Sequence, residues 1–243
     1  MAIVEIKKMA NFSNLKNPTV IVGFPGTGLV GSVAASHLID VLKLDFGGYI
    51  ESEEFAPLAA IHDYTPMPAA RIHYSEKYNL ILVLSEMSVP VVLAAPLADA
   101  IFEFAKSLKC NKIISIGGIS LKEGKTEVYV IASNKEMTKD ITEKRIAKPI
   151  REGATTGVTG LLLTKGALEK FPIITLLAES SDEYIDADAA SRVLKALAKI
   201  LNVEISTARL DKEAKGTKEA LIKSKVSKRG ATVEESAGGS MYG

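Results

Sequence analysis

The chain has 243 residues, of which 47% are apolar and 24% are charged, proportions typical of a globular protein in water. This composition excludes wholesale disorder, a collagen-like repeat and a disulfide scaffold. Thirty Lys and Arg against 29 Asp and Glu leave a formal charge of +1, so the chain as a whole lacks the basic excess of a protein that binds nucleic acid or an anionic membrane.

Short apolar runs alternate along the chain with segments of helical spacing. We expect strands at 19–24, 48–51, 80–85, 112–116, 127–132 and 173–178. Helices are predicted at 29–42, 97–108 and 188–201. Pro96 suits the first turn of the second helix, Asp186 or Asp188 is the expected N-cap of the third, and Gly117 and Gly118 are expected to end the strand before them.

Strands that alternate with helices predict an α/β domain whose largely parallel sheet carries helices on both faces. We expect this domain to cover residues 1–207. Residues 208–243 hold eight Lys or Arg, five Asp or Glu and few apolar residues, so we expect a basic, partly helical or flexible C-terminal tail. The remaining residues then carry 22 basic and 24 acidic side chains, which divides the charge into a body near −2 and a tail of +3.

A glycine-rich turn follows the first buried strand and opens a helix. Gly26, Gly28 and Gly31 have the G-x-G-x-x-G spacing of a dinucleotide-binding turn, in which Thr27 also lies. Against a nucleotide site, Pro25 removes an N–H from the turn. Three interpretations of this turn stay open: a nucleotide site, a general anion site, and a tight structural turn. We favour the structural turn. A second Gly- and Thr-rich segment at 153–160 is better explained by close helix packing.

Two acidic residues follow apolar strands. Glu86 and Glu179 lie at the carboxyl ends of two predicted strands, where ligands bind in open α/β sheets. They are therefore candidates for an acid–base pair or for a ligand site. Helix capping or a place in a solvated loop is the commoner role for such acids. The three histidines, His37, His62 and His73, lack a paired nucleophile motif, and no Walker or G-x-S-x-G pattern occurs. We therefore expect no catalytic residues.

The single cysteine, Cys110, cannot form an internal disulfide, which is consistent with a reducing cytoplasm. One Cys and three His make a metal site improbable, and we expect no metal or cofactor. The first residues lack the apolar core of a secretory signal, and no uninterrupted apolar stretch is long enough to span a membrane.

The last three residues, Met241, Tyr242 and Gly243, follow a small polar linker and combine an apolar side chain, an aromatic hydroxyl and a carboxylate. Such a compact set can dock into a pocket that presents a Lys or a backbone nest. Alone, however, three residues at a chain end are more simply a frayed terminus.

The segment Gly23–Gly31, continued by 32–39, resembles the N-terminal signature of the proteasome assembly chaperone family, and 85–86, 114–118, 153–163 and 176–180 resemble later landmarks. The resemblance covers most of residues 15–207. It implies a three-layer α/β/α sandwich around a largely parallel or mixed sheet, with an architecture like that of nucleoside phosphorylases, and a non-enzymatic role.

Archaeal members of this family carry tails that end in a hydrophobic–Tyr–any motif, which Met241, Tyr242 and Gly243 match. The resemblance implies that the tails of a homo-oligomer, alone or with a related family member, dock between α-subunits of the proteasome core particle without ATP. Several weak tails on one oligomer would bind together with a gain of roughly 10²–10⁴-fold. The alternative is a small-molecule or nucleotide-binding α/β protein that uses the glycine-rich turn.

Overall fold

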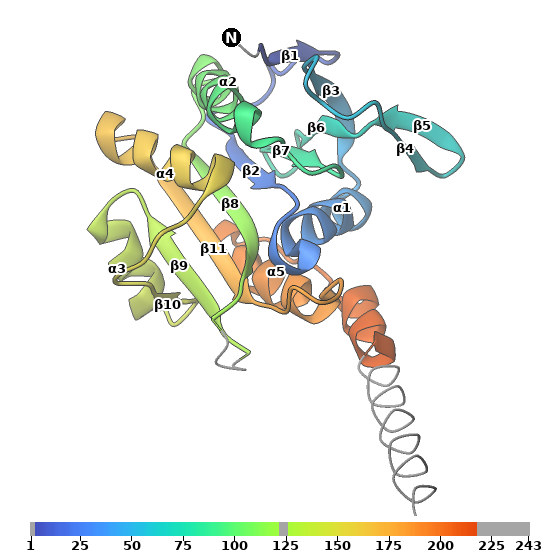
Figure 1. Cartoon of the computed structure of the whole chain (residues 1–243). Helices are drawn as coiled ribbons and strands as arrows, with labels where there is room; N and C mark the ends of the chain where they lie inside the picture. Colours follow the sequence, from blue (N-terminus) through green and yellow to red (C-terminus); the bar gives the residue numbers. More distant parts are fainter. Residues whose placement is uncertain (1–2, 122–125, 218–243) are drawn as a thin grey trace, which may run out of the picture.

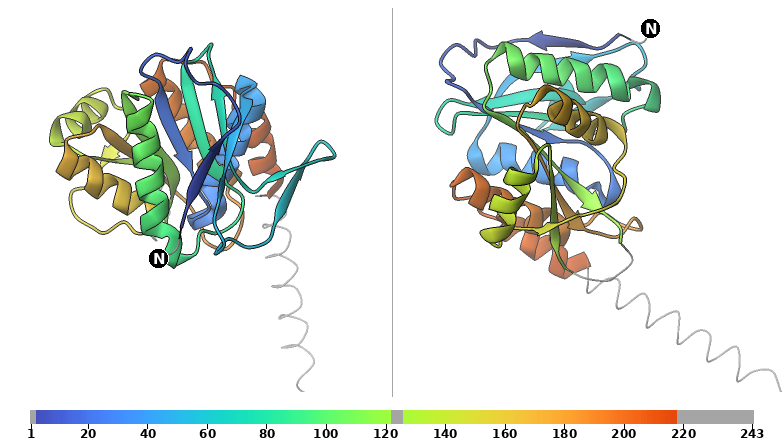
Figure 2. Two further views of the ribbon diagram at one scale, coloured as in Figure 1. Left: turned by 90° about the horizontal axis from the view of Figure 1, so that it is seen from above. Right: turned by 90° about the vertical axis from the view of Figure 1, so that its left-hand side faces the viewer.

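The computed structural model describes residues 3–121 and 126–217. The chain folds into a three-layer α/β/α sandwich around one mixed sheet, with the two-stranded β4–β5 hairpin projecting from its side (Figure 1). Helices α2 and α4 cover one face of the sheet, and α1 and α5 cover the other (Figures 1 and 2). The predicted fold class is confirmed.

The strands of the described chain are β1 (Glu5–Lys8), β2 (Thr19–Gly23), β3 (Asp45–Glu51), β4 (Ala59–His62), β5 (Thr65–Pro68), β6 (Ala70–Ser75), β7 (Leu80–Ser85), β8 (Lys112–Ile119), β9 (Val128–Ala132), β10 (Lys148–Pro149) and β11 (Ile173–Glu179). The helices are α1 (Val30–Leu42), α2 (Ala94–Ser107), α3 (Lys135–Glu143), α4 (Gly157–Glu169) and α5 (Ala187–Leu201), with short 3₁₀ turns η1 (Thr27–Leu29) and η2 (Val91–Leu93) before α1 and α2. All of the predicted strands and helices are present.

The large sheet has the order β1-β3-β6-β7-β2-β8-β11-β9-β10. Its centre, β7-β2-β8-β11, is parallel, and antiparallel strands flank it on both sides. The central strands are buried over nearly their whole length because helices cover both faces, which explains their uninterrupted apolar sequences. Their carboxyl ends all lie at one edge of the sheet.

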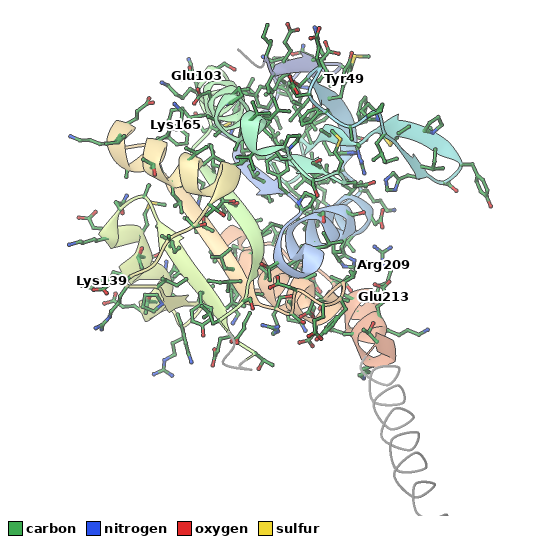
Figure 3. The ribbon with its side chains drawn as sticks, in the orientation of Figure 1. Tyr49, Glu103, Lys139, Lys165, Arg209 and Glu213 are labelled. Carbon is green, nitrogen blue, oxygen red and sulfur yellow. The ribbon has the colours of Figure 1, made fainter. Side chains whose placement is uncertain are left out.

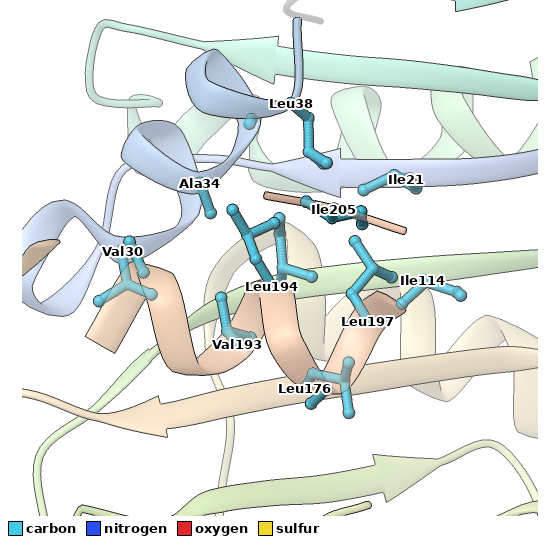
Figure 4. Packing of buried hydrophobic residues seen from close by; sticks show 14 of the residues in the cluster. Ile21, Val30, Ala34, Leu38, Ile114, Leu176, Val193, Leu194, Leu197 and Ile205 are labelled. Carbon is cyan, nitrogen blue, oxygen red and sulfur yellow. The ribbon is translucent and has the colours of Figure 1, made fainter. Parts of the chain in front are cut away.

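Two buried apolar clusters fill the spaces between the layers. In the cluster beneath α1 and α5, Leu194 and Leu197 of α5 lie close to Ala34 of α1 and to Ile114 and Leu176 of the sheet (Figure 4). The other cluster packs α2 and α4 against the opposite face. Asp186 is the N-cap of α5, because its carboxylate accepts a hydrogen bond from the backbone N–H of Ala189 at 2.9 Å.

Strand β8 does not end at its two glycines. It continues to Ile119, and Gly117 and Gly118 pair with Leu177 and Ala178 of β11. The prediction that these glycines end the strand was wrong, because pairing with β11 outweighs their weak intrinsic preference for extended structure.

Residues 208–217, the first part of the expected tail, form a helix that packs against the body. Leu210 and Ala214 are 1% and 5% exposed and belong to the cluster beneath α1 and α5. Arg209, which is labelled in Figure 3, lies on the surface of this helix. Its Nη1 lies 2.7 Å from Oδ2 of Asp40 on α1. The packed body therefore reaches at least residue 217, ten residues beyond the expected boundary.

Candidate functional site

The glycine-rich turn connects β2 to α1 and owes its spacing to close packing. Gly28 has φ = +61°, a left-handed conformation that favours glycine. A Cβ atom there would lie 2.0 Å from the Ser180 hydroxyl oxygen, and one on Gly31 would lie 2.4 Å from the Phe24 carbonyl oxygen. The backbone N–H of Asp186 also donates to the Gly28 carbonyl at 3.0 Å. Neighbouring strands and loops of the same chain therefore occupy the space beside these two glycines.

The other two residues of the predicted ligand turn, Gly26 and Thr27, are more open. No atom lies within 4 Å of a Cβ built on Gly26. Both residues line a depression of about 810 Å³ at the carboxyl ends of the parallel strands, which we call the edge groove. Its walls come from the turn after β2, residues 88–95 at and before the start of α2, the end of β8, and residues 155–161 at and before the start of α4.

The edge groove is lined by apolar side chains and hydroxyls. Among the described residues that line it there is no Lys, Arg, His, Asp or Glu. An adjoining depression, which shares Thr27 and Gly118 with it, includes Arg151 and Glu152. A phosphate in the edge groove itself would therefore meet hydroxyls and backbone N–H groups without a cationic side chain, an arrangement that does not favour a nucleotide. A ligand role for Gly26, Thr27, Gly28 and Gly31 stays a prediction.

The second glycine-rich segment belongs to a helix–sheet contact. It leads into α4, where a Cβ on Gly160 would lie 2.4 Å from the Thr155 carbonyl oxygen. The Thr159 hydroxyl forms a 2.9 Å hydrogen bond with Ser115 of β8. The Thr159 contact agrees with the packing interpretation of residues 153–160, but Gly160 is close only to its own segment and no atom lies within 4 Å of a Cβ on Gly157.

The two strand-end acids do not form a pair. Glu86 follows β7 and Glu179 ends β11, and β2 and β8 lie between these strands. At about 4.8 Å per strand, β7 and β11 are roughly 14 Å apart. The predicted acid–base pair of Glu86 and Glu179 is therefore wrong. The two acids follow similar apolar runs in the sequence, but the sheet order places two other strands between their strands.

Glu86 instead joins a cluster around the buried Arg71 of β6, which is 1% exposed. The Arg71 Nη2 donates to Glu86 Oε1 at 2.6 Å, and the Nε2–H of His62, at the end of β4, donates to the same oxygen at 2.8 Å. Arg71 Nη1 also donates to the Pro68 carbonyl of β5 at 3.3 Å. We call His62, Arg71 and Glu86 the arm latch, because they tie the base of the β4–β5 hairpin to the sheet.

His73 lies on the inner side of the arm latch. Its Nε2 accepts a hydrogen bond from Arg71 Nε at 3.2 Å, and its Nδ1–H donates to the Leu44 carbonyl at 3.3 Å. Burial lowers the pKa of His73 to about 4, and the Arg71 cation acts in the same direction. The ring is therefore neutral near pH 7. No local motif marks this cluster, because its members come from three separate segments: β4, β6 and the end of β7.

Glu179 is buried, at 6% exposure, and its Oε2 has no hydrogen-bond partner among the described residues. Its backbone carbonyl accepts a 2.6 Å hydrogen bond from Arg192 of α5. The remaining candidates, Met241, Tyr242 and Gly243, lie outside the described residues. No helix within residues 3–121 and 126–217 is long and apolar enough to cross a bilayer. In these same ranges, no three His, Cys, Asp or Glu side chains are grouped so that they could hold a metal ion.

Comparison with known proteins identifies relatives along nearly the whole chain. An uncharacterized protein of Methanocaldococcus jannaschii is 32% identical over 207 residues, which are 85% of this chain and 84% of that protein. The crystal structure of Pyrococcus furiosus PbaA, an archaeal homolog of proteasome-assembly chaperone, matches with a TM-score of 0.82 and 28% identity over 96% of both chains.

Pyrococcus furiosus PbaB, an archaeal proteasome activator, matches with a TM-score of 0.80 and 30% identity over 93% of this chain and all of that chain. The PAC2 family model matches residues 20–224. The family resemblance seen in the sequence is thereby confirmed: the chain belongs to the PAC2 family.

Proposed function

We propose that this protein binds the proteasome core particle as an assembly chaperone or activator. The observation that carries the proposal is the likeness over nearly the full chain to both PbaA and PbaB, at 28% and 30% identity. The sequence has no Walker motif, so the proposed action needs no ATP hydrolysis by this chain. The separation of Glu86 from Glu179 and the uncharged edge groove support a binding role over an enzymatic one.

The proposed contact is the C-terminal tripeptide Met241-Tyr242-Gly243, docked in pockets between α-subunits. The structure describes the packed helix up to Thr217, and the sequence continues for 26 residues, of which Gly243 is the last. A flexible chain of that length has a root-mean-square span of roughly 25–30 Å, somewhat less than the reach of a tail that began at residue 208. Docking of several tails from one oligomer would strengthen a contact that is weak for each one.

Binding of the full chain to an immobilised archaeal proteasome core particle tests the proposal. We expect removal of Met241–Gly243, Tyr242→Ala, or one Ser added after Gly243 to weaken binding at least tenfold, because each removes the ring or displaces the carboxylate. Ser240→Ala is the matched control and should bind like the parent. If the parent does not bind, the proposed function fails; if the truncated chain binds undiminished, only tail docking fails.

A further inference from the structure

A pocket of about 440 Å³ lies beyond the carboxyl end of β11. Its walls come from the loop after β11, the start of α5 and the helix at residues 208–217 (Figure 1). Three of its described lining residues are acidic, so we call it the acid pocket. Ligands of open α/β sheets bind at the carboxyl ends of the strands, and small-molecule sites have volumes of roughly 300–1,000 Å³. The acid pocket meets both conditions.

Glu179 brings an unsatisfied acceptor to the acid pocket. It lines the pocket, is 94% buried, and accepts no hydrogen bond at Oε2 from any described residue. Its backbone, in contrast, is engaged: the N–H donates to the Glu127 carbonyl at 3.0 Å, and the carbonyl accepts from Arg192 at 2.6 Å. A buried carboxylate oxygen without a donor is costly, and folded proteins rarely leave one. The acceptor therefore calls for a donor from outside the chain.

Arg192 does not supply that donor, because its guanidinium is committed to other groups. It is the only Lys or Arg among the described residues that line the pocket. Its Nε donates to Asp188 Oδ2 at 3.1 Å, Nη1 to the Glu127 carbonyl at 3.0 Å, and Nη2 to the Glu179 carbonyl at 2.6 Å. The charge of Arg192 is thus matched by Asp188, its ion-pair partner, and the Glu179 carboxylate is left without a cation from this side chain.

The partners of Asp186 among the described residues are neutral. One carboxylate oxygen accepts from the Ala189 N–H at 2.9 Å, and the other accepts from the Ser180 hydroxyl at 3.0 Å. Asp186 lines the pocket and is 7% exposed. With Glu179, it gives the described lining two acidic side chains beyond the one that Arg192 balances. Because buried charges without a counter-charge are costly, the pocket favours a ligand that carries positive charge.

An organic ammonium ion fits this pocket better than an anion or a metal ion. A phosphate at the start of α5 would meet the carboxylates of Asp186 and Asp188. Within the described parts of the chain, no three His, Cys, Asp or Glu side chains are grouped so that they could hold a metal ion. An ammonium group donates up to three hydrogen bonds, and the hydroxyls of Ser120, Ser181 and Thr217 line the pocket as further acceptors.

We propose that the acid pocket binds a small aliphatic diamine, with one ammonium group against Glu179 and the other near Asp186. The two positive charges of such a ligand match the two acids that Arg192 leaves unbalanced. Ile185, Ala187 and Ala214 line the same pocket and offer apolar surface to the methylene chain between the charges. The inference concerns a ligand of the folded body and does not depend on the proposed proteasome binding.

The wall that the helix at residues 208–217 contributes is fixed to the body before a ligand binds. Asp211 on this helix accepts hydrogen bonds from the hydroxyls of Ser191 at 2.5 Å and Thr207 at 3.1 Å, and it lies 3.1 Å from Lys195 Nζ. Ala214, about one turn further along, lines the pocket and is 5% exposed. A site whose walls are already in place loses little entropy on binding. A diamine in the pocket would contact α5 and this helix together.

Calorimetric titration of the full chain with putrescine tests the proposal, at constant ionic strength because salt screens exposed charges. We expect Glu179→Gln to weaken binding roughly tenfold to a hundredfold, since a neutral amide replaces the carboxylate that accepts from the ammonium group. Glu183→Gln is the matched control and should bind like the parent, because Glu183 is exposed, lies in the same loop and does not line the pocket. Butylamine, which has one ammonium group, should bind more weakly than putrescine, and 1,4-butanediol, which has none, should not bind.

Four results of this titration would overturn the proposal. The first is a parent chain that does not bind putrescine at millimolar concentrations. The second is a Glu179→Gln variant that binds as tightly as the parent. The third is an equal loss in Glu183→Gln, which would show general attraction to an acidic surface. The fourth is butylamine that binds as tightly as putrescine, since the second ammonium group would then have no partner in the pocket.

Two further measurements separate loss of the ligand from loss of folding. In the parent chain, putrescine should slow hydrogen exchange of residues 179–192 and 208–217 but not of the β4–β5 hairpin; unchanged exchange in both segments would contradict the site. Without ligand, Glu179→Gln should unfold at a temperature no lower than the parent's, because it removes a buried charge that lacks a counter-charge. A lower temperature would show that the Glu179 carboxylate already has a stabilising partner within the chain and would overturn the inference.

Discussion

Substitution of Gly28 by alanine separates a structural role of the glycine-rich turn from a ligand role. Gly28 has φ = +61°, and a left-handed conformation costs an L-residue about 1–2 kcal/mol. The new methyl group would lie 2.0 Å from the Ser180 hydroxyl oxygen, which must move and give up its 3.0 Å hydrogen bond to the Asp186 carboxylate. A hydrogen bond to a charged group contributes about 1.5–3 kcal/mol. The combined loss of unfolding free energy is about 2.5–5 kcal/mol.

Gly26→Ala is the matched control two residues away. Its backbone is extended, with φ = −169°, and no atom lies within 4 Å of the added Cβ, so we expect a change below about 0.5 kcal/mol. Urea denaturation followed by far-ultraviolet circular dichroism measures both variants. The packing explanation of the turn is refuted if Gly28→Ala costs less than about 1 kcal/mol, or if Gly26→Ala destabilises the protein equally.

Three further substitutions test the buried polar cluster and the packed C-terminal helix. Arg71→Met leaves Glu86 and His73 without the hydrogen-bond donor that they share. Urea denaturation should show an unfolding free energy lower by about 3 kcal/mol. A loss below about 1 kcal/mol would show that the arm latch does not stabilise the fold. The folded chain holds His73 neutral down to pH about 4, while the unfolded chain protonates it near 6.5, so acidification from pH 6.5 to 4 should favour unfolding. His73→Gln should flatten the dependence of the unfolding free energy on pH in this range. An unchanged slope would contradict the lowered pKa of His73. Leu210→Ala should cost about 2–3 kcal/mol and speed hydrogen exchange of residues 208–217, whereas a neutral effect would place these residues in a tail after all.

The local sequence determined the strands and helices whose own residues carry a clear apolar pattern. The runs at 19–23, 80–85 and 173–179 are apolar at almost every position, and only a strand covered on both faces accommodates such a run. The helical spacing of α1, α2 and α5, with the Asp186 cap, is equally local. The glycine spacing located the turn between β2 and α1, and the family signature lies in the same residues.

The tertiary structure decided the features that depend on distant partners. Strand β8 continues through two glycines because β11 pairs with them, and Glu86 and Glu179 separate because β2 and β8 lie between their strands. Leu210 is buried because α1 and α5 form its surroundings, although its own segment is polar. The arm latch depends on strand register, which no short stretch of sequence encodes, since pairing by one residue more or less would turn every side chain to the opposite face.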